Sequence, residues 1–253
     1  MTSPEIVILL FVAGFFGGAA NAMAGGATLI TFPAMLAAGL PPITANASNA
    51  LAVSFGNLTG AWRERQQLPP IDAKVQSTIA AAVVGGLLGA VLLVTTPDNV
   101  FKAVVPALIG IATLIFAFAK PIQNSLVRTM PTHQKTTLNV ALVFVASVYG
   151  GYFGAGLGVI LMAVISATNN WDMRRSNAVK NLLGVVTNVA AIVFFIYHNL
   201  ISWPQTSIML VACIAGGFAG VHLLKTMPAP TVRTMIIVIG SIMTLIYAYK
   251  FWL

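Results

Sequence analysis

The sequence predicts an all-α integral membrane protein made of two inverted repeats of five hydrophobic segments, each repeat containing one short, broken helix. Composition, an internal repeat and the distribution of basic residues support this fold class. Hydrophobic residues make up 58% of the 253 residues and charged residues only 7%, whereas a soluble domain carries about 25% charge. So few charges cannot cover a surface that faces water, so we expect the chain to contact the lipid bilayer.

The internal repeat relates residues 24–109 to residues 155–240 by a constant, gapless offset of 131. The residue types that match are ones with special backbone or packing roles. The matching pairs are Ala24 with Ala155, Gly25 with Gly156, Asn46 with Asn177, Asn57 with Asn188, Gly85 with Gly216, Gly86 with Gly217, Gly89 with Gly220 and Pro97 with Pro228. A repeated hydrophobic half interrupted by glycine is typical of transporters.

Each half contains five apolar segments. They cover 4–23, 27–38, 44–62, 74–94 and 99–119 in the first half, and 138–153, 157–168, 176–197, 204–224 and 232–250 in the second. Most approach the ~20 residues that cross a bilayer, but 27–38 and 157–168 are shorter and follow glycines. Each short segment is therefore predicted to form a broken pair with the segment before it.

The Lys and Arg residues distinguish two topologies. If every short segment is a crossing, one side of the membrane holds Arg63, Arg65, Lys74, Lys120, Arg128, Lys135, Arg174, Arg175, Lys225 and Arg233, and the other holds Lys102 and Lys250. If the short segments are re-entrant, the same residues divide seven against five. The positive-inside rule favours the first division, which places both termini outside the cytoplasmic membrane.

In this topology residues 1–119 form the first repeat, 120–136 a cytoplasmic linker and 137–253 the second repeat. Five crossings per half is an odd number, so the second repeat is inverted relative to the first. Equivalent residues of inverted repeats meet near the middle of the membrane, where such transporters bind substrate.

Several function classes are not expected. The net charge of +8 comes from basic residues in short loops, so we do not expect nucleic acid as a partner. Cys213 is the only cysteine, and there is no Cys/His cluster with metal spacing. Motifs of hydrolases, zinc proteases and phosphate-binding loops are also absent from the sequence. We therefore expect no enzyme, no cofactor and no metal; the oligomeric state stays open, with a homodimer as one alternative.

The glycines before the short segments are the first candidate site. A helix that begins inside the membrane exposes unpaired N–H groups and the positive end of its dipole, and an anion satisfies both. The alternative is that these small residues only allow close helix packing. Because the pattern occurs twice, we predict substrate binding by Gly25, Gly26, Thr28, Gly156 and Gly158.

Polar residues on the third segment of each half are the second candidate site. They are Asn46, Asn49 and Asn57 in the first half, and Asn177, Lys180, Asn181 and Asn188 in the second. Amide and ammonium groups donate hydrogen bonds to substrate oxygens, although amides in a membrane also link helices to one another. Lys180, whose repeat counterpart is Asn49, either binds the substrate or extends to the interface.

Acidic residues indicate the charge of the solute. Glu5, Glu64, Asp72, Asp98 and Asp172 all lie in predicted loops or at segment ends. A cation transporter usually has carboxylates within the membrane. A small anionic solute is therefore the expected partner, together with the lipid bilayer.

The chain resembles the TauE/SafE family of sulfite and organosulfonate exporters. The residues that carry the resemblance are 14–18 (GFFGG), 24–26 (AGG), 32–33 (FP) and 44–48 (TANAS), with 150–158 (GGYFGAGLG) and 176–178 (SNA) in the second half. The resemblance covers essentially the whole chain. It implies export, or less often uptake, of small sulfur-containing anions across the inner membrane.

Three classes of function remain after these observations. The leading hypothesis is a secondary transporter that moves sulfite or an organosulfonate by alternating access. A passive channel for small oxyanions is the alternative, because no coupling residue is evident in the sequence. A membrane module without transport activity is disfavoured by the polar lining of the repeat.

Overall fold

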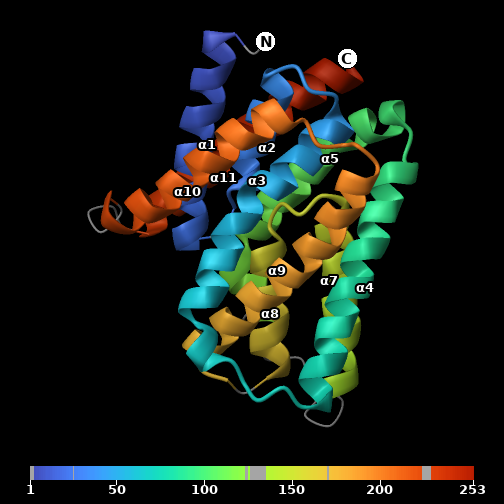
Figure 1. The fold of residues 1–253 in the computed structure, drawn as a ribbon, viewed down its shortest axis with the longest axis vertical. Coiled ribbons are helices and arrows are strands. Elements are labelled where there is room, and N and C mark those ends of the chain that lie inside the picture. Colours follow the sequence, from blue (N-terminus) through green and yellow to red (C-terminus); the bar gives the residue numbers. More distant parts are fainter. Residues whose placement is uncertain (1–2, 25, 123–124, 126–134, 170, 224–228) are drawn as a thin grey trace.

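The apolar segments form helices, as predicted. The structure, a computed structural model, describes residues 3–24, 26–122, 125, 135–169, 171–223 and 229–253. These residues contain helices, turns and loops but no β-strand. The all-α fold class is therefore confirmed for the described part of the chain (Figure 1).

Each predicted segment corresponds to one helix. The first half contains α1 (Pro4–Ala24), α2 (Thr28–Ala37), α3 (Pro42–Arg63), the 3-10 helix η1 (Arg65–Gln67), α4 (Ala73–Thr95) and α5 (Asp98–Ala117). The second half contains α7 (Lys135–Tyr152), α8 (Leu157–Thr168), α9 (Met173–Tyr197), α10 (Trp203–Leu223) and α11 (Ala229–Trp252). The two short helices are confirmed, since α2 has 10 residues and α8 has 12.

Two of the acidic residues at segment ends have a structural role. The side chain of Asp72 accepts a hydrogen bond from Val75 N–H at 2.8 Å, and that of Asp172 accepts one from Arg175 N–H at 2.7 Å. Each carboxylate thereby caps the first turn of a helix, α4 or α9, whose N–H groups have no partner within the helix. These two residues explain where α4 and α9 begin.

Helices from the two halves pack against each other. The most extensive pairs are α1 with α10 and α4 with α7, followed by α5 with α11 and by α9 with both α4 and α3. Figure 1 shows α1 and α10 together on one side of the molecule and α4 and α7 on the other. Every one of these pairs joins one half of the chain to the other, so neither half packs as an independent domain.

Glycines allow the two most extensive helix pairs to approach closely. A Cβ atom on Gly216 of α10 would meet the Phe15 carbonyl of α1, and one on Gly89 of α4 would meet the Val148 carbonyl of α7. The Cβ of Gly85 would lie 2.6 Å from the Phe144 oxygen. Small residues at such crossings let helix backbones touch, as in many membrane bundles. Gly217 differs, because its Cβ would lie 3.9 Å from the nearest atom, the oxygen of Gly18.

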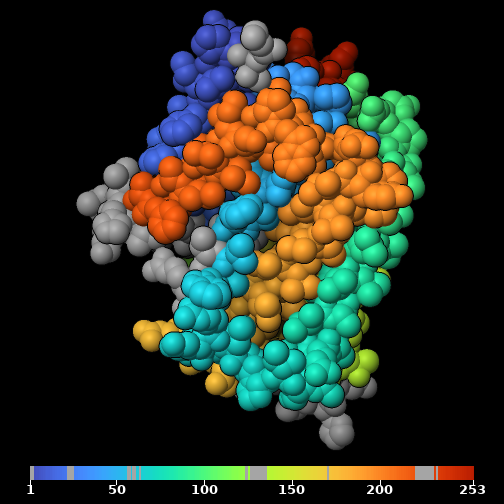
Figure 2. All heavy atoms as spheres, viewed as in Figure 1, coloured from blue at the N-terminus to red at the C-terminus, as the bar shows by residue number. Residues whose placement is uncertain are grey.

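The outer surface is apolar over the length of the helices. Among the described residues, α1, α4, α5, α9 and α11 contain five segments long and apolar enough to cross a membrane. Large side chains such as Val84, Val193 and Phe218 point outward on α4, α9 and α10, which form most of the face in Figure 2 together with α3. A soluble monomer rarely exposes so large an apolar surface, so the protein is a multi-pass membrane protein.

Candidate functional site

The break between α7 and α8 is buried in the protein interior. Phe153 and Ala155 are 3% and 0% exposed, and Gly154 and Gly156 both adopt φ +78°. That left-handed conformation favours glycine, which lacks a Cβ. The Tyr149 hydroxyl donates to the Ala155 carbonyl at 2.7 Å and holds the turn in place. The predicted glycine break is therefore a fixed turn that starts α8 inside the molecule.

The first turn of α8 presents backbone donors next to open space. Leu157 N–H donates to Gly154 O and Val159 N–H to Gly156 O, whereas no acceptor among the described residues reaches the N–H of Gly158. A Cβ on Gly158 would have no atom within 4 Å. The free N–H, the positive end of the α8 dipole and the adjacent space together fit an anion.

The break between α1 and α2 has a similar form. Gly26 adopts φ +122° and its carbonyl accepts from Leu29 N–H at 3.0 Å. Thr28 opens α2 and is buried at 8% exposure. Gly25 lies outside the described residues, so its predicted role stays a prediction.

Both breaks lie against the same turn of α5. The Cβ position of Gly26 is 3.0 Å from the Phe116 ring, and that of Gly156 is 3.7 Å from the Ala112 carbonyl and 3.9 Å from Ile115. Residues 112, 115 and 116 share one face of a helix because they are three and four positions apart. The two glycine breaks, 131 residues apart in the sequence, thus come together at one place in the fold.

Asn46 and Asn49 are buried on α3, and Asn46 contacts the end of α7 next to one of these breaks. They are 2% and 1% exposed, and among the described residues no donor reaches the side-chain oxygen of either. The Asn46 amide nitrogen donates to the Tyr152 carbonyl at 2.9 Å. A carbonyl only accepts, so this contact fixes the orientation of the Asn46 amide, with Oδ1 as the free group. The site therefore offers acceptors as well as the predicted donors.

The polar residues at the start of α9 surround a carboxylate. Asn177 donates from its amide nitrogen to both oxygens of Glu64, at 2.7 and 2.8 Å, and Asn181 donates to Oε2 at 3.1 Å. Lys180 is half-buried and lies within the electrostatic influence of the same carboxylate. The structure thus places Asn177 and Asn181 against Glu64, which the sequence did not single out, and their predicted role in substrate binding, like that of Lys180, stays a prediction.

The remaining predicted residues lie further along the third helices. Asn188 on α9 is buried at 8% exposure. It follows Thr187, whose hydroxyl donates to the Ser147 hydroxyl at 3.0 Å and so joins α9 to α7. Asn57 belongs to α3, but its side chain lies outside the described part of the structure, so its predicted role remains open.

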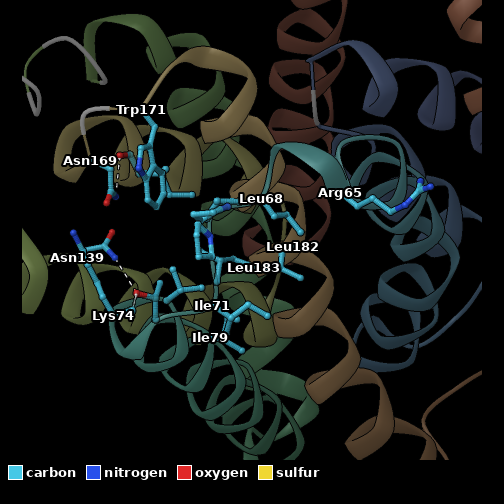
Figure 3. A pocket seen from close by; sticks show the side chains of 16 residues that line it. Arg65, Leu68, Ile71, Lys74, Ile79, Asn139, Asn169, Trp171, Leu182 and Leu183 are labelled. Atoms are coloured by element: carbon cyan, nitrogen blue, oxygen red, sulfur yellow. Dashed lines mark hydrogen bonds between the residues drawn. The ribbon is translucent and has the colours of Figure 1, made fainter.

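A cavity of ≈ 480 Å³ lies between α4, α7, α8 and α9, next to the chain segment that follows Glu64. Its polar wall is a chain of hydrogen bonds: Asn169 donates to Thr168, Thr168 to Asn139, and Asn139 to Thr78. Figure 3 shows Asn139 and Asn169 close to each other on this wall. The Arg65 guanidinium is turned away from it (Figure 3). Arg65 instead stacks on Trp62, 4.4 Å from the ring centre. Sequence reasoning did not identify this cavity.

The described residues contain no group of three or more His, Cys, Asp or Glu side chains that could hold a metal ion. What they do contain is a pair of buried helix starts, buried amides and one lysine, all enclosed by apolar helices. Such a combination defines a multi-pass membrane protein with an internal polar site, the architecture of a solute transporter.

The chain belongs to the sulfite exporter TauE/SafE family of membrane transporters, whose family model matches residues 10–247. It is 24% identical over 250 residues to the probable membrane transporter protein YfcA of Escherichia coli K12, covering 96% of this chain and 90% of that protein. It is 27% identical over 241 residues to the probable membrane transporter protein ORF9 of Sinorhizobium sp., covering 93% and 90%. No solved structure matches the chain.

Proposed function

We propose that the protein is a secondary transporter that exports a small sulfur-containing anion, sulfite or an organosulfonate, across the cytoplasmic membrane by alternating access. The observation that carries the proposal is the meeting of the two glycine breaks against one turn of α5. Each break begins a short helix, so two positive helix ends and the free Gly158 N–H point to the interior site. The name of the family supports the substrate class.

The pairing of helices supports an inverted repeat. Replacing each helix by its repeat counterpart converts the α1–α10 pair into the α7–α4 pair and leaves the α3–α9 and α5–α11 pairs unchanged. A two-fold relation between the halves has this property. In an inverted repeat the axis lies in the membrane plane, so rocking of one half against the other would open the site to each side in turn.

The basic residues support the sidedness of the proposal. By the positive-inside rule they favour a cytoplasmic linker around residues 120–136 and both termini outside. In this orientation the Glu64 contact with α9 lies on the cytoplasmic side of the site, because Arg63, Arg65, Arg174 and Arg175 flank it. An exported anion would meet this end first.

The anion would meet these groups in turn: the Lys180 ammonium near Glu64, then the Gly158 N–H and the amide of Asn49, which lies 15 residues before Glu64, about 22 Å along a helix. Asn49 and Lys180 are repeat counterparts, so the two halves contribute different groups at equivalent positions. Ammonium and amide donors recognise oxyanions. The unpaired oxygen of Asn46 would accept a hydrogen bond from a protonated anion or from another donor group of the solute.

The double variant Lys180→Ala with Asn49→Ala is expected to lower sulfite or organosulfonate flux by about tenfold or more. It removes a charged and a neutral hydrogen-bond donor, and a loss of about 1.4 kcal/mol in binding free energy corresponds to a factor of ten. Purified protein in liposomes would be used to measure the flux. Lys102→Ala, which removes an exposed lysine at the start of α5, is the control and should keep wild-type flux. Unchanged flux in the double variant would contradict the assignment of these residues.

A further inference from the structure

One polar contact between the two halves involves a carboxylate of the protein itself. Glu64 follows the last residue of α3, and its carboxylate accepts three hydrogen bonds from the first three turns of α9. Asn177 and Asn181 are four residues apart, so their amides lie on one face of the helix. Lys180 precedes Asn181 and carries a positive charge near the same carboxylate.

This group of residues has the chemistry of an oxyanion site. The amide nitrogens and the ammonium only donate, and an ionised carboxylate only accepts. Two oxygens bonded to one carbon are held here at 2.7–3.1 Å, the range of N–H···O hydrogen bonds. Glu64 therefore occupies the two amide donors in the same way that a free oxyanion would.

We propose that Glu64 is an internal oxyanion ligand that competes with the transported anion for Asn177 and Asn181, beside the charge of Lys180, and leaves them when that anion binds. The inference rests on the proposed function, because it assigns a role to one end of the proposed site. Two anions cannot share these donors, since like charges placed together repel each other. Substrate arrival and Glu64 departure would thus be coupled.

The position of Glu64 gives its departure a structural consequence. Glu64 precedes η1 and the residues that line the ≈ 480 Å³ cavity, among them Leu68 and Ile71. In Figure 3, Leu68 lies beside Leu182 and Leu183 of α9, directly after Lys180 and Asn181 in the sequence. Release of Glu64 would free one end of the segment between α3 and α4 from α9, on the side where we propose that the anion enters.

A purely structural role for Glu64, as a polar link between α3 and α9, makes a different prediction. A structural link is weakened by substitution, but it does not compete with a solute. A competing ligand leaves behind an empty oxyanion site when its side chain is removed, and a small free oxyanion can then fill that site. Acetate, which carries the same carboxylate group, is the direct probe for this difference.

The test is thermal unfolding of the purified full-length protein over a concentration series of acetate or sulfite, with chloride keeping the ionic strength constant. A ligand that binds only the folded state raises the unfolding temperature. In Glu64→Ala, both anions should act at concentrations about tenfold lower than in the wild type. Glu64→Gln keeps the size of the side chain, serves if the alanine variant does not fold, and should shift the sulfite series in the same direction. Glu5→Gln makes the same chemical change at an exposed position on α1 and should match the wild type.

The outcomes separate this inference from the proposed function. Equal acetate and sulfite series in the wild type and the Glu64 variants would overturn the inference, even if the wild type transports sulfite. A response of Glu64→Ala to acetate, with no sulfite response in any variant, would support the internal ligand and contradict sulfite as the substrate. Weaker anion binding in the Glu64 variants would show that Glu64 helps to form the site, and would also overturn the inference.

Discussion

Gly216→Ala is expected to prevent stable folding, whereas Gly217→Ala, one residue further along α10, is expected to be tolerated. The Cβ of residue 216 would overlap the Phe15 carbonyl and lie 2.6 Å from its carbon, so backbone atoms of α1 would have to move. The added Cβ of residue 217 would have 3.9 Å of clearance. Overpacking in a well-packed core costs about 1–3 kcal/mol, and a clash with backbone cannot be relieved by a change of rotamer.

Fluorescence-detected size-exclusion chromatography and the unfolding temperature would measure this difference. Gly216→Ala should give aggregated protein or a strongly lowered unfolding temperature. Gly217→Ala should elute like the wild type, because alanine is also favoured over glycine in a helix by about 1 kcal/mol. Equal behaviour of the two variants would contradict the close crossing of α1 and α10.

Gly158→Leu is expected to leave the fold intact and to abolish most of the transport. The Cβ of residue 158 points into open space with no atom within 4 Å, and its φ is compatible with any L residue. A leucine there would occupy the space beside the first turn of α8, where we propose that the anion binds. This glycine therefore differs from Gly216, because its small size would serve the substrate rather than helix packing.

Flux in liposomes and the unfolding temperature should be measured together for the Gly158 variants. Gly158→Ala adds a single methyl group, and should lower flux less than Gly158→Leu, which should lower it about tenfold or more. Both variants should unfold at or above the wild-type temperature, because glycine is unfavourable within a helix. Wild-type flux in the leucine variant would exclude the start of α8 as part of the pathway.

The helices and both breaks could be predicted from the sequence because each leaves a local signal. Apolar length predicts the helices, and glycine predicts a backbone that other residues avoid, which Gly26, Gly154 and Gly156 confirm with positive φ angles. The offset of 131 connected the two breaks without any knowledge of contacts. The sequence thus contained enough information to predict the α2 and α8 starts as a pair.

The role of Glu64 could not be predicted in the same way, because it depends on how α3 crosses α9. Its partners Asn177 and Asn181 are 113 and 117 residues away, and an acidic residue at a segment end has the same local pattern as a helix cap. One signal was available: the proposed topology places the end of the third segment and the start of the eighth on the same side of the membrane. The orientation of the Asn46 amide likewise depends on a distant carbonyl, that of Tyr152.

The central claim, alternating access to an internal anion site, is tested most directly by counterflow of sulfite in liposomes that contain the purified protein. Unlabelled sulfite inside the liposomes should accelerate the entry of radiolabelled sulfite. The reason is that the binding site of an alternating-access transporter turns back from the inside to the outside faster with substrate bound than when it is empty. A passive channel would carry sulfite without such acceleration. Acceleration that is lost in the Lys180→Ala, Asn49→Ala double variant is the predicted result, and flux without acceleration, or no sulfite flux at all, would contradict it.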